Sequence, residues 1–187
     1  MALIYFLCPT VRGLITPFRP RKGVVIGARA THNSLYKSPV LQEKYLSVSQ
    51  AAHHMANNQV RNLGTVGGNL VNAVPSADLP PILIALGAVV KLVGSGGERV
   101  LPLEEFFTGP GKTVIAQDEI LTEIIIPDQP FTGSTYFKFG LRRSGALAVV
   151  GVAAAVVCGA PTYGGRMPSP LRCGQRGGRT LEPVSEA

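Results

Sequence analysis

The feature that most constrains this chain is a cluster of glycines at positions 64, 67 and 68, within the stretch QVRNLGTVGGN (59–69). Glycine loses more conformational freedom on folding than any other residue. A cluster of it therefore indicates a tight turn or a backbone that something approaches closely. Small residues also let successive backbone N–H groups converge on an anion such as a phosphate. A plain glycine-rich turn between a helix and a strand stays open as the alternative.

Two familiar nucleotide-binding motifs do not fit this sequence. The dinucleotide fingerprint needs G-x-G-x-x-G between a strand and a helix, whereas GTVGGN has a different spacing and follows a predicted helix. The stretch GPGKT (109–113) resembles the end of a Walker A loop. That motif requires a glycine at position 106, where this chain has Phe106, and Pro110 lacks an N–H group. We therefore exclude an ATPase loop.

The hydrophobic and turn patterns predict helices early in the chain and hairpin-linked strands later. The expected helices are 48–58 and 79–86, with a short amphipathic turn or helix at 103–107. The expected strands are 24–28, a hairpin of 89–93 with 98–101, then 119–127, 134–141 and 147–157, the first and last of them buried. This order predicts an α+β fold with an antiparallel sheet plus helices rather than a repeating βαβ pattern.

The formal net charge of +7 is concentrated at the two ends of the chain. Residues 23–157 contain ten Lys and Arg against nine Asp and Glu, a net of +1, while residues 1–22 contribute +4 and residues 158–187 contribute +2. No basic stripe with interleaved aromatic residues occurs in the middle, so the sequence argues against nucleic-acid binding.

Cysteine and histidine spacing argues against a metal site encoded by this chain. The three cysteines lie far apart with no CxxC pair, which is typical of reduced thiols in a cytoplasmic protein. His53 and His54 are adjacent on a predicted helix and face different directions, so a shared metal is not expected, and His32 reads as an ordinary polar turn residue. No apolar stretch is long enough to cross a bilayer, and membrane insertion is not expected.

A longer stretch carries a resemblance to a known family. The run QVRNLGTVGGNLVNAVPSADLPPILIALGA, followed by GERVLPLEEFFTGPGKT, EILTEIIIP and FKFGLRRSGALAVVGVAAAV, resembles the FAD-binding subunit of the molybdenum hydroxylases. This family includes the medium subunit of aerobic carbon monoxide dehydrogenase and the flavin domain of xanthine dehydrogenase. The resemblance covers about residues 23–157 and implies a PCMH-type FAD-binding domain of the α+β class.

The resemblance also implies where FAD binds. The positions it assigns to the cofactor are Thr65, Val66, Gly67, Gly68, Asn69, Asp78, Leu121 and Lys138. Within this set, residues 65–69 would line the FAD, Asp78 would lie near its polar chain, and Leu121 and Lys138 would approach the flavin ring. A lysine near the ring would stabilise negative charge on the reduced flavin; a strand lysine facing solvent is the alternative.

The implied activity is that of an electron-transfer flavoprotein subunit of an oxidoreductase. Its partners would be a large subunit with the molybdenum cofactor and a small subunit with 2Fe-2S clusters. Electrons would pass from these partners through FAD to NAD⁺, oxygen, a quinone or another acceptor. No acid–base pair or nucleophile is expected in this chain, because the cofactor supplies the chemistry.

The two ends of the chain depart from the family pattern. Residues 1–22 form an atypical segment without the Ala-Gly-Gly flavin motif expected upstream of Val24, and residues 158–187 form a Gly/Pro/Arg-rich tail that we expect to be disordered. We therefore hypothesise a truncated or frame-disturbed copy whose isolated chain binds FAD weakly or not at all. The alternative function is a flavin-free remnant that acts only as an interaction module or is non-functional.

Overall fold

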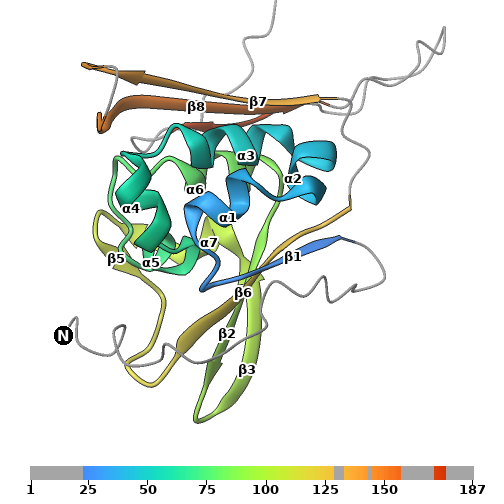
Figure 1. Cartoon of the computed structure of the whole chain (residues 1–187). Helices are drawn as coiled ribbons and strands as arrows, with labels where there is room; N and C mark the ends of the chain where they lie inside the picture. The colour runs from blue at the N-terminus through green and yellow to red at the C-terminus, as the bar shows by residue number, and fades with distance from the viewer. Residues whose placement is uncertain (1–22, 129–132, 143–144, 157–170, 176–187) are drawn as a thin grey trace, which may run out of the picture.

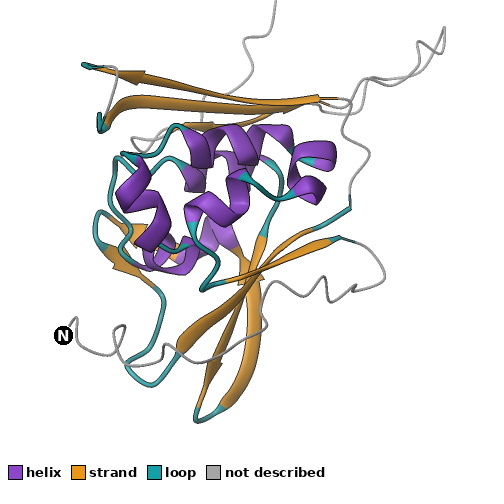
Figure 2. Ribbon diagram, in the orientation of Figure 1, coloured by secondary structure: helices purple, strands orange, loops and turns teal. Residues whose placement is uncertain are grey.

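A layer of helices lies between the two larger of three antiparallel sheets, the third being a small two-stranded one (Figures 1 and 2). The computed structural model describes residues 23–128, 133–142 and 145–156, and the backbone of 171–175. The helices in these ranges are α1 (His32–Tyr36), α2 (Pro39–Lys44), α3 (Leu46–His53), α4 (Asn58–Leu63), α5 (Val66–Val71), α6 (Leu79–Ala85) and α7 (Leu103–Phe106). The strands are β1 (Val24–Gly27), β2 (Val89–Gly94), β3 (Gly97–Pro102), β4 (Phe107–Gly109), β5 (Lys112–Thr113), β6 (Ile120–Ile126), β7 (Gly133–Gly140), β8 (Ala148–Val156) and β9 (Leu171–Gln175). The predicted α+β class is confirmed.

The first sheet has four strands in the order β1-β6-β2-β3, all antiparallel to their neighbours. Its hairpin, β2 and β3, closes at the Gly94–Gly97 pair, as the Gly-Ser-Gly-Gly turn predicts. The inward residues Val90 and Ile124 are fully buried and pair with each other across β2 and β6. This sheet supports the helical layer from below in Figure 1.

The second sheet has three described strands in the order β7-β8-β9, and its inner face packs on α3 and α6. The expectation of a buried strand at 147–157 is wrong for one face of that strand. On β8, Val150 is 42% exposed, and it pairs with the exposed Phe139 of β7 on the outer face. Strand side chains alternate between faces, so an apolar run can still leave one face uncovered.

The helix predicted at 48–58 is in fact two helices. The helix α3 ends at His53, and Ala56 has a positive φ of 40°, a left-handed conformation that interrupts a helix. Asn57 then caps a separate helix, α4, because its side chain accepts a hydrogen bond from the N–H of Val60. Asn57, which lies near the end of the predicted helix, is therefore the start of a second helix.

The predicted helix at 79–86 is confirmed as α6, whose first turn carries Pro80 and Pro81. Its side chains enter the main hydrophobic core between the two sheets. The fully buried large side chains of that core include Phe106, Leu70, Leu79, Ile82, Leu83, Leu86, Leu92, Leu103, Ile124 and Ile126. Among the described residues we find no helix with both the length and the apolar character needed to cross a membrane.

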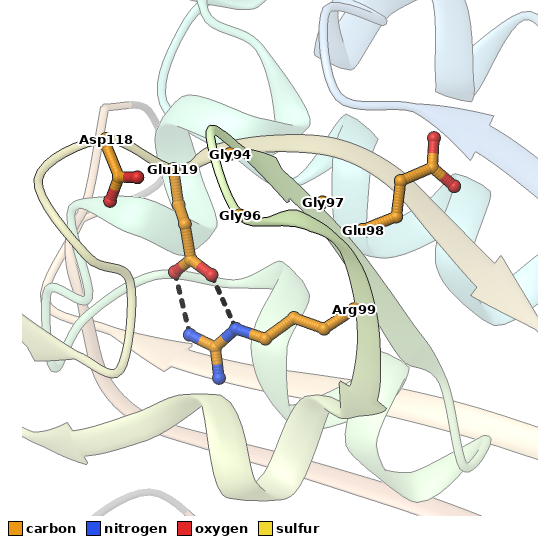
Figure 3. A pocket seen from close by; sticks show the side chains of 7 residues that line it. All are labelled: Gly94, Gly96, Gly97, Glu98, Arg99, Asp118 and Glu119. Atoms are coloured by element: carbon orange, nitrogen blue, oxygen red, sulfur yellow. Dashed lines mark hydrogen bonds and ion pairs between the residues drawn. The ribbon is translucent and has the colours of Figure 1, made fainter.

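An ion pair fixes the β2–β3 hairpin to the start of β6. Arg99 donates from Nε and Nη2 to the two carboxylate oxygens of Glu119, at 2.6 and 2.7 Å, and Glu119 also accepts from the N–H of Ala116 at 2.8 Å. Figure 3 shows this pair among the residues that line a pocket at the hairpin tip. The hydrogen bonds from Arg99, and next that from Ala116, lower the pKa of Glu119 to about 2.

Glu119→Gln tests this pair through the pH dependence of stability. Because the folded-state pKa lies below the ordinary value of 4.5, the contribution of Glu119 is full above about pH 4.5 and is lost as the pH falls to about 2. Urea unfolding should show wild type more stable than Glu119→Gln at pH 6, with the difference shrinking below pH 4.5. A difference that stays constant from pH 6 to pH 2 would contradict the assignment.

Candidate functional site

The glycine-rich loop joins α4 to α5 and is held by a threonine cap. Thr65 is the N-cap of α5, and its Oγ1 accepts a hydrogen bond from the N–H of Gly68 at 3.1 Å. Its backbone forms an isolated antiparallel bridge with Thr31, which caps α1 in the same way through Ser34. The starts of two short helices are thereby fixed side by side.

The backbone N–H groups of this loop are used inside the protein. Val66 donates to the carbonyl of Ala30 at 2.9 Å, and Gly67 donates to the carbonyl of Ala28 at 2.8 Å. The N–H of Asn69 donates to the carbonyl of Thr65 at 3.0 Å. The expected convergence of free N–H groups on an anion is therefore not what the structure contains. The loop instead docks on the segment that follows β1.

The close approach that the glycines predict is present, and the approaching group is the protein's own backbone. A Cβ at Gly67 would lie 2.8 Å from both the Cβ and the carbonyl oxygen of Ala28. A Cβ at Gly64 would lie 3.0 Å from the ring of His32. These glycines let the start of α5 pack directly against the segment that follows β1, and let the loop pack against His32 of α1.

Two buried polar atoms without a partner belong to residues at this loop. They are the Oδ1 of Asn69 and the Nδ1 of His32. Buried polar atoms in folded proteins are nearly always hydrogen-bonded, so an unpartnered acceptor indicates a ligand or a water. FAD carries ribityl, ribose and adenine groups that can donate to such an acceptor, so Asn69 fits the cofactor that the resemblance implies.

His32 is the residue at this site that the sequence did not reveal. It is only 3% exposed, starts α1 and packs on Gly64, so the expectation of an ordinary polar turn residue is wrong. Burial, and next the nearby charge of Arg61, lower the pKa of His32 to about 4, so the ring is neutral at pH 7. The glycines lie about thirty residues after His32 in the sequence. The bridge between Thr31 and Thr65 brings them next to it.

Asp78 and Lys138, sixty residues apart in sequence, form a buried ion pair. The Nζ of Lys138 lies 2.9 Å from the Oδ2 of Asp78, and the two side chains are 9% and 5% exposed. Lys138 also donates to the carbonyl of His54 at 3.1 Å, and Tyr136 donates from its hydroxyl to the Oδ1 of Asp78 at 2.8 Å. The alternative of a strand lysine facing solvent is excluded.

Leu121 occupies a different environment from these polar residues. It lies on β6, is 5% exposed, and belongs to the main hydrophobic core. Val66, at the start of α5, belongs to the same core, and α5 packs against β6. The structure therefore connects Leu121 to the glycine loop through core packing.

The remaining candidates make local contacts. The ring of His53 stacks on Tyr36 with 4.3 Å between centroids and meets His54 edge-on at 5.9 Å. In the part of the chain that the structure describes, no group of three or more His, Cys, Asp and Glu side chains is arranged to hold a metal ion. The pocket of Figure 3 contains none of the residues that the resemblance assigns to FAD.

Solved structures that share this fold include carbon monoxide dehydrogenases. The reconstituted enzyme from Oligotropha carboxidovorans superposes with a TM-score of 0.71 and 32% identity, covering 74% of this chain and 49% of that chain. The enzyme from Hydrogenophaga pseudoflava that lacks the Mo-pyranopterin moiety of its cofactor gives a TM-score of 0.70 and 32% identity, covering 82% of this chain and 50% of that chain. The fold is thus one found in molybdenum hydroxylases.

The sequence profile of the FAD binding domain in molybdopterin dehydrogenase matches residues 11–129, and the chain belongs to this family. The carbon monoxide dehydrogenase medium chain of Hydrogenophaga pseudoflava is 37% identical over 131 residues, covering 70% of this chain and 45% of the relative. The nicotine 6-hydroxylase medium subunit of Paenarthrobacter nicotinovorans is 35% identical over 130 residues, again covering 70% and 45%. The chain spans about half the length of the curated relatives it matches. The resemblance and the cofactor, FAD, are confirmed.

Gly67→Ala tests the backbone packing of the loop. The new Cβ would overlap Ala28, and overpacking costs about 1–3 kcal/mol. This exceeds the gain of about 1 kcal/mol that alanine has over glycine in a helix. Urea unfolding should show a net loss of stability for Gly67→Ala. The matched control is Gly96→Ala, whose Cβ would meet nothing within 4 Å. Equal stabilities for the two variants would contradict the packing.

His32→Gln tests the neutral, buried histidine. Because the folded-state pKa is lowered from 6.5 to about 4, the unfolded chain binds the proton more tightly. The stability of wild type should therefore be full above about pH 6.5 and fall as the pH drops to about 4, by up to about 3 kcal/mol relative to the variant. Unfolding curves measured from pH 7.5 to pH 4 provide the comparison. Parallel profiles for the two proteins would show that His32 is not buried as described.

Proposed function

We propose that this chain is the FAD-binding, electron-transferring part of a molybdenum hydroxylase-type complex. Two observations together carry the proposal: the family match and the buried Asp78–Lys138 pair. The pair matters because the resemblance assigns both of its residues to FAD. The unpartnered Oδ1 of Asn69 supports it from the glycine loop.

FAD, when bound, supplies the redox chemistry, accepting electrons and passing them on. In this proposal residues 65–69 line the cofactor, and the side chains of Thr65 and Asn69 provide its polar contacts, because the N–H groups of Val66, Gly67, Gly68 and Asn69 are already used. Asp78 lies near the polar chain of FAD, and Leu121 and Lys138 approach its ring. The positive charge of Lys138 would stabilise negative charge on the reduced ring.

The proposed partners are a large subunit with the molybdenum cofactor and a small subunit with 2Fe-2S clusters. The relatives are named as medium chains or medium subunits of carbon monoxide dehydrogenase and of nicotine 6-hydroxylase, names that imply a larger and a smaller chain in those enzymes. For this chain, electrons would arrive from the small subunit and leave to NAD⁺, oxygen, a quinone or another acceptor. We place this complex in the cytoplasm.

A flavin-free interaction module is the second candidate. Two observations favour it: the N–H groups of the glycine loop are satisfied within the protein, and the outer face of β7 and β8 exposes apolar side chains. Phe137 is 67% exposed and pairs across the strands with Val152. Apolar faces of this kind often mark contact surfaces.

FAD titration of the purified chain separates the two candidates. We expect saturable binding with one FAD per chain, weak enough that little flavin absorbance at about 450 nm remains after gel filtration. Asn69→Ala should weaken binding roughly tenfold, since a buried hydrogen bond is lost, whereas Asn72→Ala at the far end of α5 should leave it unchanged. Absence of saturable binding in wild type would favour the flavin-free module.

A further inference from the structure

Tyr136 is a buried polar residue at the candidate site to which the resemblance assigns no role. It lies on β7, two residues before Lys138, so both side chains are on the inner face of the strand. Tyr136 is 7% exposed, and its hydroxyl donates to the Oδ1 of Asp78 at 2.8 Å. The two donors on β7 thus hold the two oxygens of one carboxylate.

The Asp78 carboxylate is oriented by these donors rather than by its own helix. Asp78 occupies the N-cap position of α6 but makes no capping hydrogen bond through its side chain. Its Oδ2 receives the ammonium of Lys138, which is held from the other side by the carbonyl of His54 just after α3. A carboxylate with a different donor on each oxygen has a fixed plane, and the ammonium that it binds has a fixed position.

The neighbouring strand β8 has a glycine, Gly151, where the side chain of Tyr136 packs against it. Gly151 on β8 pairs with Lys138, and a Cβ at that position would lie 2.8 Å from the Tyr136 hydroxyl. A glycine inside a strand is unfavourable unless something must approach closely. Here the group that approaches is the phenol of Tyr136, so β7 and β8 together build its position.

We infer that Tyr136 is a positioning residue of the proposed flavin site, which orients the Asp78 carboxylate and through it fixes the ammonium of Lys138. The inference rests on the proposed function because Asp78 and Lys138 are positions assigned to FAD. A neutral phenol suits this role: it adds a hydrogen bond without competing for the negative charge that holds the lysine. Without the hydroxyl, Oδ1 loses a buried donor, and the carboxylate rotates towards other partners.

Acylation of lysines by an N-hydroxysuccinimide ester, quantified by peptide mass spectrometry, tests the inference on the whole chain without cofactor. Tyr136→Phe should raise the modification rate of Lys138 roughly tenfold, the effect of one buried hydrogen bond. Lys91, paired with Glu98 on the other sheet, should keep its rate. Tyr45→Phe, which removes a 3.3 Å contact to the carbonyl of Pro127, is the matched control and should leave Lys138 protected.

The same substitution in the Asp78→Asn background distinguishes positioning from general loosening of β7. If Tyr136 acts through the Asp78 carboxylate, Tyr136→Phe should not raise the modification rate of Lys138 further once an amide replaces that carboxylate. An equal increase in both backgrounds, or no increase in either, would overturn the inference. Gly151→Ala displaces the phenol from the opposite strand and should also expose Lys138, which gives a second variant should Tyr136→Phe fold poorly.

FAD titration then separates this inference from the proposed function. If wild type binds FAD, Tyr136→Phe should weaken binding several-fold, and Tyr45→Phe should not; equal affinities would contradict a role at the flavin site. If wild type binds no FAD, the proposed function fails. The acylation rates still decide whether Tyr136 fixes Lys138, because they are measured without flavin.

Discussion

The candidate site depends on the ion pair of Asp78 and Lys138, which is almost completely buried between the helical layer and the three-stranded sheet. Removing Asp78 and Lys138 from water costs several kcal/mol per charge, by the usual order of magnitude, and their attraction offsets this only when the remaining hydrogen-bonding capacity is also satisfied. Tyr136 and the carbonyl of His54 supply the additional contacts. The start of α6, the end of α3 and β7 are consequently fixed relative to one another.

The glycine loop is also held by buried polar groups that are satisfied within the protein, and these are backbone N–H and carbonyl groups rather than charges. Its N–H groups donate hydrogen bonds to the carbonyls of Ala28 and Ala30. Because Gly67 has no Cβ, its backbone can come close enough to Ala28 to form this bond. Because Thr31 and Thr65 are bridged, any displacement of α5 also displaces the start of α1, where His32 is buried. Backbone packing therefore sets the position of Asn69, whose Oδ1 is buried without a hydrogen-bond partner.

Local patterns predicted most of the elements, and contacts distant in sequence account for the errors. The sequence predicts three elements correctly because each depends on residues close together in the chain. They are the hairpin that closes at Gly94–Gly97, the helix α6 that begins with prolines, and the alternating strand β7. The break at Ala56 was missed because alanine is a good helix former, and only the tertiary fold imposes its positive φ. The pairing of Asp78 with Lys138 and the burial of His32 depend on segments about sixty and thirty residues away, which periodicity does not encode.

The alternation of β7 joins the polar site to the opposite face of the same sheet. Tyr136 and Lys138 point towards the helices, whereas Phe137 lies between them on the outer face and is paired with Val152 of β8. A strand in a hydrogen-bonded ladder moves as a unit, and a shift of register by one residue would exchange the two faces. The buried ion pair therefore also specifies the register of β7, because only one register places Lys138 against Asp78 and leaves Gly151 opposite it. The same register decides which apolar side chains of β7 face outward. The ion pair on the inner side of the sheet therefore also fixes the composition of the outer face.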